Sequence, residues 1–480
     1  MIFSSPLFLF SFLPLFFLAY AFAGSLKLKN YVILIGSIIF YAWIEPKFIF
    51  LLIISIYFDW LLGNLIFKSQ DNKNVQKWYF ILALALNIGL LAYFKYTNFF
   101  VENMNNALSI LHINNLFWKK IALPVGISFI VFEKISYIAD IYRGAGKPAK
   151  SFDSYALFVL LFTKLLAGPI VQYHDMADQL YEREHSSNDI IYGIYRFSAG
   201  LAKKVLVADV VGIVVDEIFK LPAQSISLYY SWLGIVCFAL QIYFDFSGYS
   251  DMAIGMSRIM GFRLVENFNF PYISANITEF WRRWHMSLSA WLRDYLYTPL
   301  AFSVRSWGKL SVIFALMVTF TLCGLWHGAN WTFVVWGIYQ GIFLAFDWTF
   351  WQERSKKLPK IFNIVLTFLV IMIGWVIFRA ETLNYAGSYL LAMFNFTGKV
   401  LPQNFQFVYI FRSFKITVLI ALILSFFPAT RSFVRLENIY NNMKDNDKTA
   451  VQMYSAIILL FFAILKISTS SFIAFLYFRF

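Results

Sequence analysis

The chain has 480 residues, of which 60% are hydrophobic and 14% charged, and its formal net charge is +14. Soluble domains carry roughly 45–50% apolar and 25% charged residues, so this composition excludes an ordinary soluble enzyme. The positive charge does not indicate nucleic-acid binding, because no basic cluster is long enough or lies on a soluble segment. A mild attraction to anionic lipid headgroups accounts for the basic residues instead.

Apolar runs of about 20 residues, the length needed to cross a bilayer, recur along the whole chain. They are continuous rather than alternating, which favours helices and excludes a β-barrel. We therefore predict an all-α polytopic membrane protein with about 11–13 membrane helices, forming a single domain over 1–480. The expected spans are 2–24, 31–44, 47–67, 78–98, 121–139, 154–171, 198–219, 228–260 with a polar break, 310–328, 331–350, 361–379, 411–427 and 450–465.

The first apolar run, Ile2 to Ala23, contains small residues like those of a signal-peptide cleavage site. No basic residue precedes the run and it is longer than a signal core, so we expect a retained first helix. Cys237 and Cys323 lie in apolar surroundings and are expected to be buried thiols, without a disulfide.

Basic residues in the short loops predict the orientation. Loops such as Asp175 to Asp189 are poor in Lys and Arg or acidic. The positive-inside rule places the basic loops in the cytoplasm and the N-terminus in the periplasm. The basic residues are Lys27, Lys29, Lys68, Lys73, Lys77, Arg143, Lys147, Lys150, Arg354, Lys356, Lys357 and Lys360.

Several ionisable residues fall inside the expected spans, where an unpaired charge is costly. Asp59, Glu133, Lys134 and Lys164 are examples. Glu133 and Lys134 are adjacent and cannot share a helix face, so each needs a partner elsewhere in the fold.

A polar centre interrupts the span at 228–260 with Asp245, Ser250 and Asp251. Asp251 and Arg258 are seven residues apart on one helix face, so the bland interpretation is a structural ion pair. The alternative is a polar wall that lines a substrate path.

The segment from Gly261 to Lys309 lacks a long apolar run but has apolar residues at helical spacing. We predict an amphipathic helix that lies on the membrane surface or packs beside a cavity. The residues of its apolar face are Ile277, Trp281, Trp284, Leu288, Trp291 and Tyr295.

His285 lies within this predicted helix, with Ser289 one turn later and arginines around it. A structural histidine is the bland interpretation. A second Trp-rich segment, 42 residues further on, favours a functional one because it carries His327 inside an apolar run. Asn330 lies three residues after His327, on the same face if the helix continues.

Gly324 and Gly328 remove side-chain bulk around His327, so a substrate or another helix can approach closely. A neutral histidine in a low-dielectric environment is a good general base near neutral pH. The chain lacks phosphate-binding loops, HExxH, nucleophile elbows and paired CxxC motifs. Without an evident activated nucleophile, direct transfer between two bound substrates is more natural than an acyl-enzyme. No metal site is expected.

Long motifs resemble the membrane-bound O-acyltransferase family, in particular its bacterial branch of alginate and peptidoglycan O-acetyltransferases. They are YFDFSGYSDMAIG, NFNFPYISANITEFWRRWHMSLSAWLRDYLYTPL and LCGLWHGANW, together with PVGISFIVFEKISYIADIYRG, LLAGPIVQYHDM and the C-terminal FIAFLYFRF. The resemblance covers nearly the whole chain, with its catalytic region at about 240–340.

The resemblance implies a multi-helix fold around a transmembrane tunnel that connects a cytosolic acyl thioester with an acceptor outside. The family's catalytic histidine falls on His327 and its supporting histidine on His285. Acetyl-CoA is then the donor substrate, with no bound cofactor. His327 deprotonates the attacking hydroxyl. Support for the substrate and oxyanion is expected from Asn330, Trp326, Trp281, Ser289 or His285.

Arg282 and Arg283 either hold the donor's phosphates or anchor the chain at the membrane interface. A glycan polymer is unsuited to threading into a tunnel, so we expect a periplasmic partner that carries a serine and resembles an esterase. Its docking face is expected on the regions 99–118 and 380–410, with Phe394, Phe396 and Phe405 exposed.

Two alternatives remain open. The chain could transfer D-alanine from a carrier-protein thioester toward teichoic acid, or it could be a transporter or channel whose buried histidines relay protons. The expected acceptor is a cell-envelope or secreted polysaccharide such as peptidoglycan or alginate. The expected location is a bacterial inner membrane.

Overall fold

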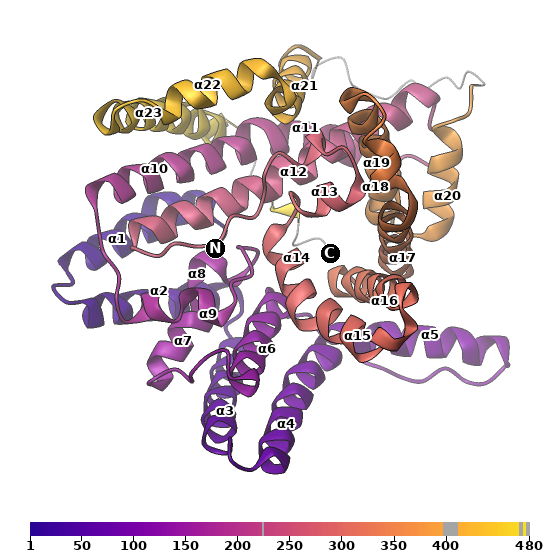
Figure 1. The fold of residues 1–480 in the computed structure, drawn as a ribbon. Coiled ribbons are helices and arrows are strands. Elements are labelled where there is room, and N and C mark those ends of the chain that lie inside the picture. Colours follow the sequence, from indigo (N-terminus) through magenta and orange to yellow (C-terminus); the bar gives the residue numbers. More distant parts are fainter. Residues whose placement is uncertain (223–224, 397–410, 470–473, 477–480) are drawn as a thin grey trace. The chain divides into compact units, whose positions relative to one another are not determined.

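The computed structural model describes residues 1–222, 225–396, 411–469 and 474–476 (Figure 1). Helices make up its regular structure, which confirms the predicted all-α class. The chain forms two compact units: 1–186 with 256–265, and 187–255 with 266–480. A single catalytic domain over the whole chain stays a prediction.

Eight of the described helices are long and apolar enough to cross a membrane. A ninth is counted if the bent pair Phe414–Ala429 and Arg431–Asn441, with an angle of 78°, forms one span. The polytopic class is confirmed, and the number of candidate spans in the part of the chain that the structure describes is below the expected 11–13. The eight are Leu26–Ile44 (α2), Phe48–Lys68 (α3), Lys73–Ile110 (α4 and α5), Leu228–Ile259 (α12), Lys309–His327 (α16), Trp331–Ser355 (α17 and α18), Lys360–Arg379 (α19) and Asp445–Thr469 (α23).

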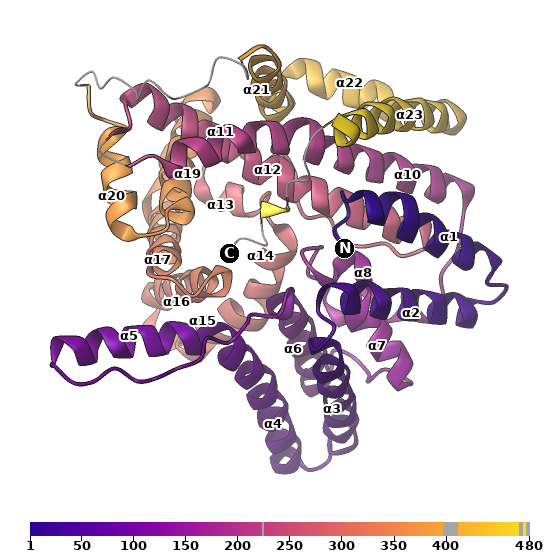
Figure 2. The same ribbon diagram turned by 180° about the vertical axis from the view of Figure 1, so that it is seen from behind.

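In the first unit, α3 and α4 (Lys73–Leu91) lie side by side in both views (Figures 1 and 2) and both pack against α6. Rings of Phe16 and Phe40 pack on that of Phe162, with centroids 5.0 and 5.6 Å away. The smaller helices of the unit are α1 (Leu13–Phe22), α5 (Thr97–Ile110), α6 (Ile127–Arg143), α7 (Phe152–Leu160), α8 (Phe162–Leu165) and α9 (Tyr173–Met176).

Four buried charges of the first unit form two ion pairs, as the sequence predicts for Glu133 and Lys134. The Lys134 ammonium lies 3.0 Å from the carboxylate of Asp59, and Glu133 pairs with Lys164. The Asn87 amide also donates to Asp59 at 2.7 Å. Each pair joins two different segments, so the adjacent charges on α6 fix two neighbours at once.

The expected span at 154–171 is wrong as a single crossing. The nine residues of α7 and the four of α8 are each too short, and Leu161 between them has an extended ψ of 109°. The backbone N–H of Lys150, just before α7, donates to the hydroxyl of Tyr181 at 2.9 Å. Leu161 interrupts the helix midway, and the two ends of the segment lie together, as they do in a re-entrant segment. Residues 152–182 are called the re-entrant segment below.

In the second unit, α10 (Ser187–Ala202) crosses α12 at two glycine pairs. A Cβ on Gly200 would lie 2.5 Å from the carbonyl oxygen of Gly248, and one on Gly255 would lie 2.5 Å from that of Gly193. The seven-residue spacing on both helices fits an antiparallel crossing with the backbones in close contact.

The same unit packs α23 on α10, and α17 (Trp331–Phe346) on α16 and α19. Cys237 and Cys323 are free and buried, as expected. The other helices are α11 (Asp209–Lys220), α13 (Ile277–Trp281), α14 (Met286–Leu292), α15 (Thr298–Ser303), α18 (Gln352–Ser355), α20 (Leu383–Ala392), α21 (Phe411–Phe426) and α22 (Arg431–Asn441).

Candidate active site

His327 is the last residue of α16, where the chain turns back into α17. Asn330 is the N-cap of α17: its side-chain oxygen accepts the backbone N–H of Thr332 at 3.1 Å. Its amide nitrogen donates to the carbonyl of Glu381 at 3.1 Å. The helix does not continue through Asn330, so the expectation that it shares a helical face with His327 is wrong. Its side chain stabilises the turn between α16 and α17.

Close packing of α16 on α17 holds His327 in place. A Cβ on Gly324 would lie 2.2 Å from the carbonyl oxygen of Phe333, and one on Gly337 would lie 2.3 Å from that of Phe320. No side chain fits at either position, because the obstructing atoms belong to the backbone. Gly324, three residues before His327, therefore allows close contact between the two helices, which is one of the two roles expected from the sequence.

An aromatic cage surrounds the imidazole of His327, which is 9% exposed. Its centroid lies 4.9 Å from that of Trp326, 5.2 Å from Trp336 and 5.3 Å from Phe378. The imidazole therefore lies among apolar rings at the end of α16.

The helix expected through His285 is broken there. One helix ends at Trp281 and the next begins at Met286, with His285 between them in a left-handed conformation of φ 45° and ψ 52°. A non-glycine residue in this region needs stabilisation from its surroundings. The backbone N–H of Met286 supplies part of it, since it donates to the carbonyl of Asn267 at 2.9 Å.

Asn267 also fixes the tautomer of His285. Its Oδ1 accepts the backbone N–H of Ser287 at 3.3 Å and the hydroxyl of Ser287 at 2.9 Å, while its Nδ2 donates to Ser250 at 3.0 Å. A backbone N–H can only donate, so the amide orientation is set. The 3.1 Å contact between this Oδ1 and Nδ1 of His285 is therefore donated by the imidazole. His285 carries its proton on Nδ1.

The other nitrogen of His285, Nε2, is buried and has no hydrogen-bond partner among the described residues. Burial lowers the pKa of His285 to about 3, so the ring is neutral and Nε2 is a free acceptor. Its ring centroid lies 6.2 Å from Trp326 and 4.6 Å from Phe246. The structure thus brings both predicted histidines to the same indole, that of Trp326.

A pocket of about 470 Å³ in the second unit adjoins the His285 turn. Ser289 and Thr319 line it with hydroxyls that have no hydrogen-bond partner among the described residues. Arg282 and Arg293 line it as well, and the guanidinium of Arg293 also binds Asp294 at 2.7 Å. Such a pocket combines an apolar lumen with two guanidinium groups and two free hydroxyls.

Two predicted site residues take other roles around this pocket. Arg283 does not line it: its guanidinium binds Glu279 at 2.9 Å and the carbonyl of Asn269 at 3.2 Å. Trp281 does line it, but its indole N–H donates to Gln340 at 3.2 Å. Arg293 was not predicted as a site residue, because nothing in its local pattern sets it apart from the flanking arginines.

The polar centre of α12 is built as ion pairs. Asp251 binds Arg196 at 2.7 Å and Lys203 at 2.6 Å, and the expected pair of Asp251 with Arg258 stays a prediction. Asp245 binds Lys204 at 2.8 Å. These contacts favour the structural interpretation over a lining role, whereas Ser250 reaches His285 indirectly through Asn267.

A short C-terminal segment also enters the second unit. The backbone N–H of Leu476 donates to Asp245 at 2.6 Å. The ring of Phe475 is 1% exposed and lies 6.1 Å from Phe246, the ring that contacts His285. Asn267 and this segment are the supports that sequence reasoning missed; both lie within the quoted motifs, which were the signal available. Among the described residues, no group of three His, Cys, Asp or Glu side chains is placed to hold a metal ion.

Comparison with known proteins places these features in a family. Residues 149–386 match the model of the membrane-bound O-acyltransferase family. The probable alginate O-acetylase AlgI of Pseudomonas syringae pv. tomato is 41% identical over 455 residues, which cover 94% of this chain and 85% of that protein. The peptidoglycan O-acetyltransferase of Helicobacter pylori is 34% identical, and the match covers 100% of this chain and 98% of that protein.

A more distant relative is the teichoic acid D-alanyltransferase of Bacillus subtilis, which is 29% identical over 54% of this chain and 70% of that protein. The nearly full-length matches and the family model agree with the helical membrane architecture. This polytopic chain is an acyltransferase that belongs to the membrane-bound O-acyltransferase family.

Proposed function

We propose that this chain is an O-acetyltransferase that takes acetyl groups from cytosolic acetyl-CoA and passes them across the inner membrane for O-acetylation of peptidoglycan or an alginate-like polysaccharide. The observation that supports it most is the meeting of His285 and His327 at Trp326, in a buried aromatic environment. The near full-length likeness to an alginate O-acetylase and a peptidoglycan O-acetyltransferase supports acetyl as the group transferred.

In the proposed reaction, His327 takes the proton of an acceptor hydroxyl as its oxygen attacks the thioester carbonyl carbon. The tetrahedral intermediate collapses, the carbon–sulfur bond breaks, and the thiol leaves with the proton returned by His327. The products are an acetyl ester and coenzyme A. No oxidant, metal or covalent enzyme intermediate is needed for the balance.

His285 is proposed to orient the acceptor. Its Nε2 is an acceptor in the tautomer that Asn267 imposes, so it suits a substrate hydroxyl better than an oxyanion. The indole N–H of Trp336 has no hydrogen-bond partner among the described residues and lies on the ring that faces His327. We assign oxyanion support to Trp336, with Trp326 as the second candidate.

The 470 Å³ pocket is proposed to receive the donor. Arg282 suits phosphate groups, since guanidinium binds them with two parallel hydrogen bonds, whereas the guanidinium of Arg293 is bound by Asp294. Ser289 and Thr319 offer hydroxyls to the amide-bearing arm that links phosphate to thioester. Arg283, expected in this role, is occupied by Glu279.

A periplasmic partner with a nucleophilic serine is proposed to accept the acetyl group before the polysaccharide does. Phe394 and Phe396 of the expected docking region are 59% and 84% exposed, and Phe117 of the 99–118 region is 99% exposed. Phe405 lies outside the described residues.

Transport of acetyl from inside to outside is the direct test. Proteoliposomes receive labelled acetyl-CoA inside and purified peptidoglycan or alginate outside, with and without the candidate partner. Labelled ester on the outer polymer supports acetyl transfer. Label that stays with coenzyme A, while a D-alanyl carrier-protein thioester gives transfer, favours the D-alanyl alternative. Efficient polymer acetylation without a partner excludes an obligatory one, and movement of intact solute instead of acyl groups favours the transporter alternative.

The proposed orientation has its own test in intact cells. Single cysteines at Lys73, Lys357 and Glu182 are expected to resist a membrane-impermeant thiol reagent. Glu182 is included because it shares a pocket with Gln70 and Lys147, which puts the loop from Asp175 to Asp189 on the predicted cytoplasmic side, opposite to the side that its acidic composition suggested. Ready labelling at these positions from outside would reverse the topology. Both native cysteines are buried, which keeps the background low.

A further inference from the structure

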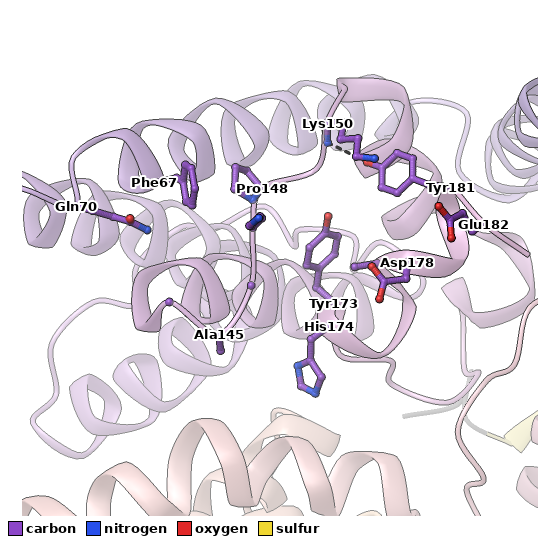
Figure 3. Close-up of a pocket in the computed structure, with 14 residues that line it drawn as sticks. Phe67, Gln70, Ala145, Pro148, Lys150, Tyr173, His174, Asp178, Tyr181 and Glu182 are labelled. Carbon is purple, nitrogen blue, oxygen red and sulfur yellow. Dashed lines mark hydrogen bonds between the residues drawn. The ribbon is translucent and has the colours of Figure 1, made fainter.

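A second pocket, of about 920 Å³, lies in the first unit, where three segments meet. The end of α3 supplies Phe67 and Gln70, the loop after α6 supplies Gly144 to Lys150, and the re-entrant segment supplies Tyr173 to Glu182. In Figure 3, Ala145 and Pro148 lie on one side of Tyr173, with Asp178 and Glu182 on the other. The proposed transfer chemistry uses none of these residues.

The walls of this pocket are fixed by hydrogen bonds that share one buried residue, Asp140, which is 3% exposed. Its carbonyl accepts the backbone N–H groups of Ala145 at 2.9 Å and Gly146 at 3.2 Å, which closes the loop. Its carboxylate lies 3.0 Å from Nδ1 of His174 on the re-entrant segment. Asp140 therefore holds two walls at once, and the concavity is built into the fold.

Charges of opposite sign line the pocket without pairing. Lys147 and Lys150 belong to the loop, and Asp178 and Glu182 to the re-entrant segment. Among the described residues none of the four has an ion-pair partner; the ammonium of Lys150 instead lies 4.3 Å from the ring centroid of Tyr181. The ammonium groups and the carboxylates of these four side chains are therefore open to whatever fills the pocket.

The pocket opens where a membrane span ends. Helix α3 is a candidate span that finishes at Lys68, and the neighbouring Phe67 and Gln70 line the pocket. A phospholipid headgroup at that interface is within reach. A headgroup with a phosphate and a primary amine matches both kinds of charge, because lysines bind phosphate oxygens and carboxylates bind an ammonium.

We propose that this pocket binds a phosphoethanolamine group, with Lys147 and Lys150 on the phosphate and Asp178 and Glu182 on the ammonium. The group can come from an aminophospholipid or from the soluble glycerophosphoethanolamine. A phosphatidylglycerol headgroup lacks the ammonium, and a choline headgroup lacks N–H donors for the carboxylates. Selectivity for the primary amine is the property that separates this site from general attraction to anionic lipid.

The test uses the full-length protein extracted from vesicles with equal amounts of phosphatidylethanolamine and phosphatidylglycerol, followed by native mass spectrometry of retained lipid. The wild type is expected to retain phosphatidylethanolamine in preference. The double variants Lys147→Gln with Lys150→Gln, and Asp178→Asn with Glu182→Gln, are expected to lose that preference by about tenfold, the effect of losing a charge-assisted hydrogen bond. Glu353→Gln with Lys357→Gln, outside the pocket, is the matched control.

A second arm identifies the source of the group. Glycerophosphoethanolamine is titrated into protein held in phosphatidylglycerol alone, with glycerophosphoglycerol as the control. Tight binding of the soluble form assigns the site to a free metabolite, and retention of the lipid alone assigns it to the membrane. The proposal is overturned if neither form is preferred over its glycerol counterpart, or if the pocket variants behave as the control does.

Discussion

The side-chain oxygen of Asn267 lies 3.1 Å from Nδ1 of His285 and accepts its proton, which leaves Nε2 of His285 as a bare, buried acceptor. Three donors converge on this one oxygen: the His285 ring and both the backbone and the hydroxyl of Ser287. Asn267 is fully buried. A residue 18 positions earlier in the chain thus decides what one of the two histidines can do chemically.

Replacing Asn267 by leucine is expected to lower acetyl transfer at least tenfold. The change leaves buried donors without an acceptor, which costs about 1–3 kcal/mol for each, and frees the His285 ring to rotate. Transfer rates and thermal stability are measured together. Asn363→Leu, at a buried asparagine that binds Ser355, is the matched control. If both variants lose the same activity for each degree by which the melting temperature falls, Asn267 has only a structural role.

The pH dependence of stability follows from His285. Its pKa is about 3 in the fold and 6.5 in the unfolded chain. Between these values the unfolded chain binds a proton that the folded chain does not, so stability falls as pH falls from about 6.5 toward about 3. His285→Asn is expected to flatten this acid loss in thermal unfolding of the detergent-solubilised protein. His112→Asn is the control, since asparagine tolerates the positive φ of 55° there. An unchanged slope in His285→Asn would contradict the assignment.

The contact of α16 with α17 predicts the effect of a single methyl group. Gly324→Ala and Gly337→Ala place a Cβ within 2.2 and 2.3 Å of backbone oxygens, so the helices must separate. We expect a loss of roughly 1–3 kcal/mol and reduced activity, because His327 moves with the end of α16. Gly89→Ala on α4 meets nothing within 4 Å and is expected to be neutral or slightly stabilising. Wild-type activity in Gly324→Ala would show that His327 tolerates the displacement.

Binding of the acetyl-CoA donor is expected to depend on Arg282 and not on its neighbour Arg283. Arg282→Gln is expected to raise KM for acetyl-CoA about tenfold or more, since it removes a charge-assisted contact to phosphate. Arg283→Gln is the control, because its partners are Glu279 and Asn269. Initial rates at varied acetyl-CoA give the comparison. A larger KM effect in Arg283→Gln than in Arg282→Gln would place the phosphates elsewhere.

The sequence predicted the membrane class and separate partners for Glu133 and Lys134, because apolar run length and the cost of buried charge are local properties. The catalytic roles of His285 and His327 stay predictions. It did not predict the break at His285, since aromatic spacing favours one helix and the left-handed turn depends on the distant Asn267. An asparagine before an apolar run, such as Asn330, is an ordinary N-cap signal. The sequence therefore did indicate a new helix at Trp331, but the prediction assumed a continuous one.

Hydropathy also could not distinguish a crossing from the re-entrant segment at 152–182. Residues 154–173 are buried by protein, so they are as apolar as a lipid-facing span, and the return of the chain shows in tertiary contacts such as the hydrogen bond between Lys150 and Tyr181. The sequence also could not show that Arg282 lines the pocket and Arg283 does not. Adjacent residues point to different sides of a helix, and the sequence does not say which side holds the pocket.

The central claim is that His327 is the general base of acetyl transfer, and single-turnover transfer from acetyl-CoA by purified His327→Ala tests it most directly. We expect the rate to fall by ~10²–10⁴, with unchanged insertion and thermal stability within the range of the control His112→Asn. Near wild-type transfer by a folded His327→Ala protein would contradict the account.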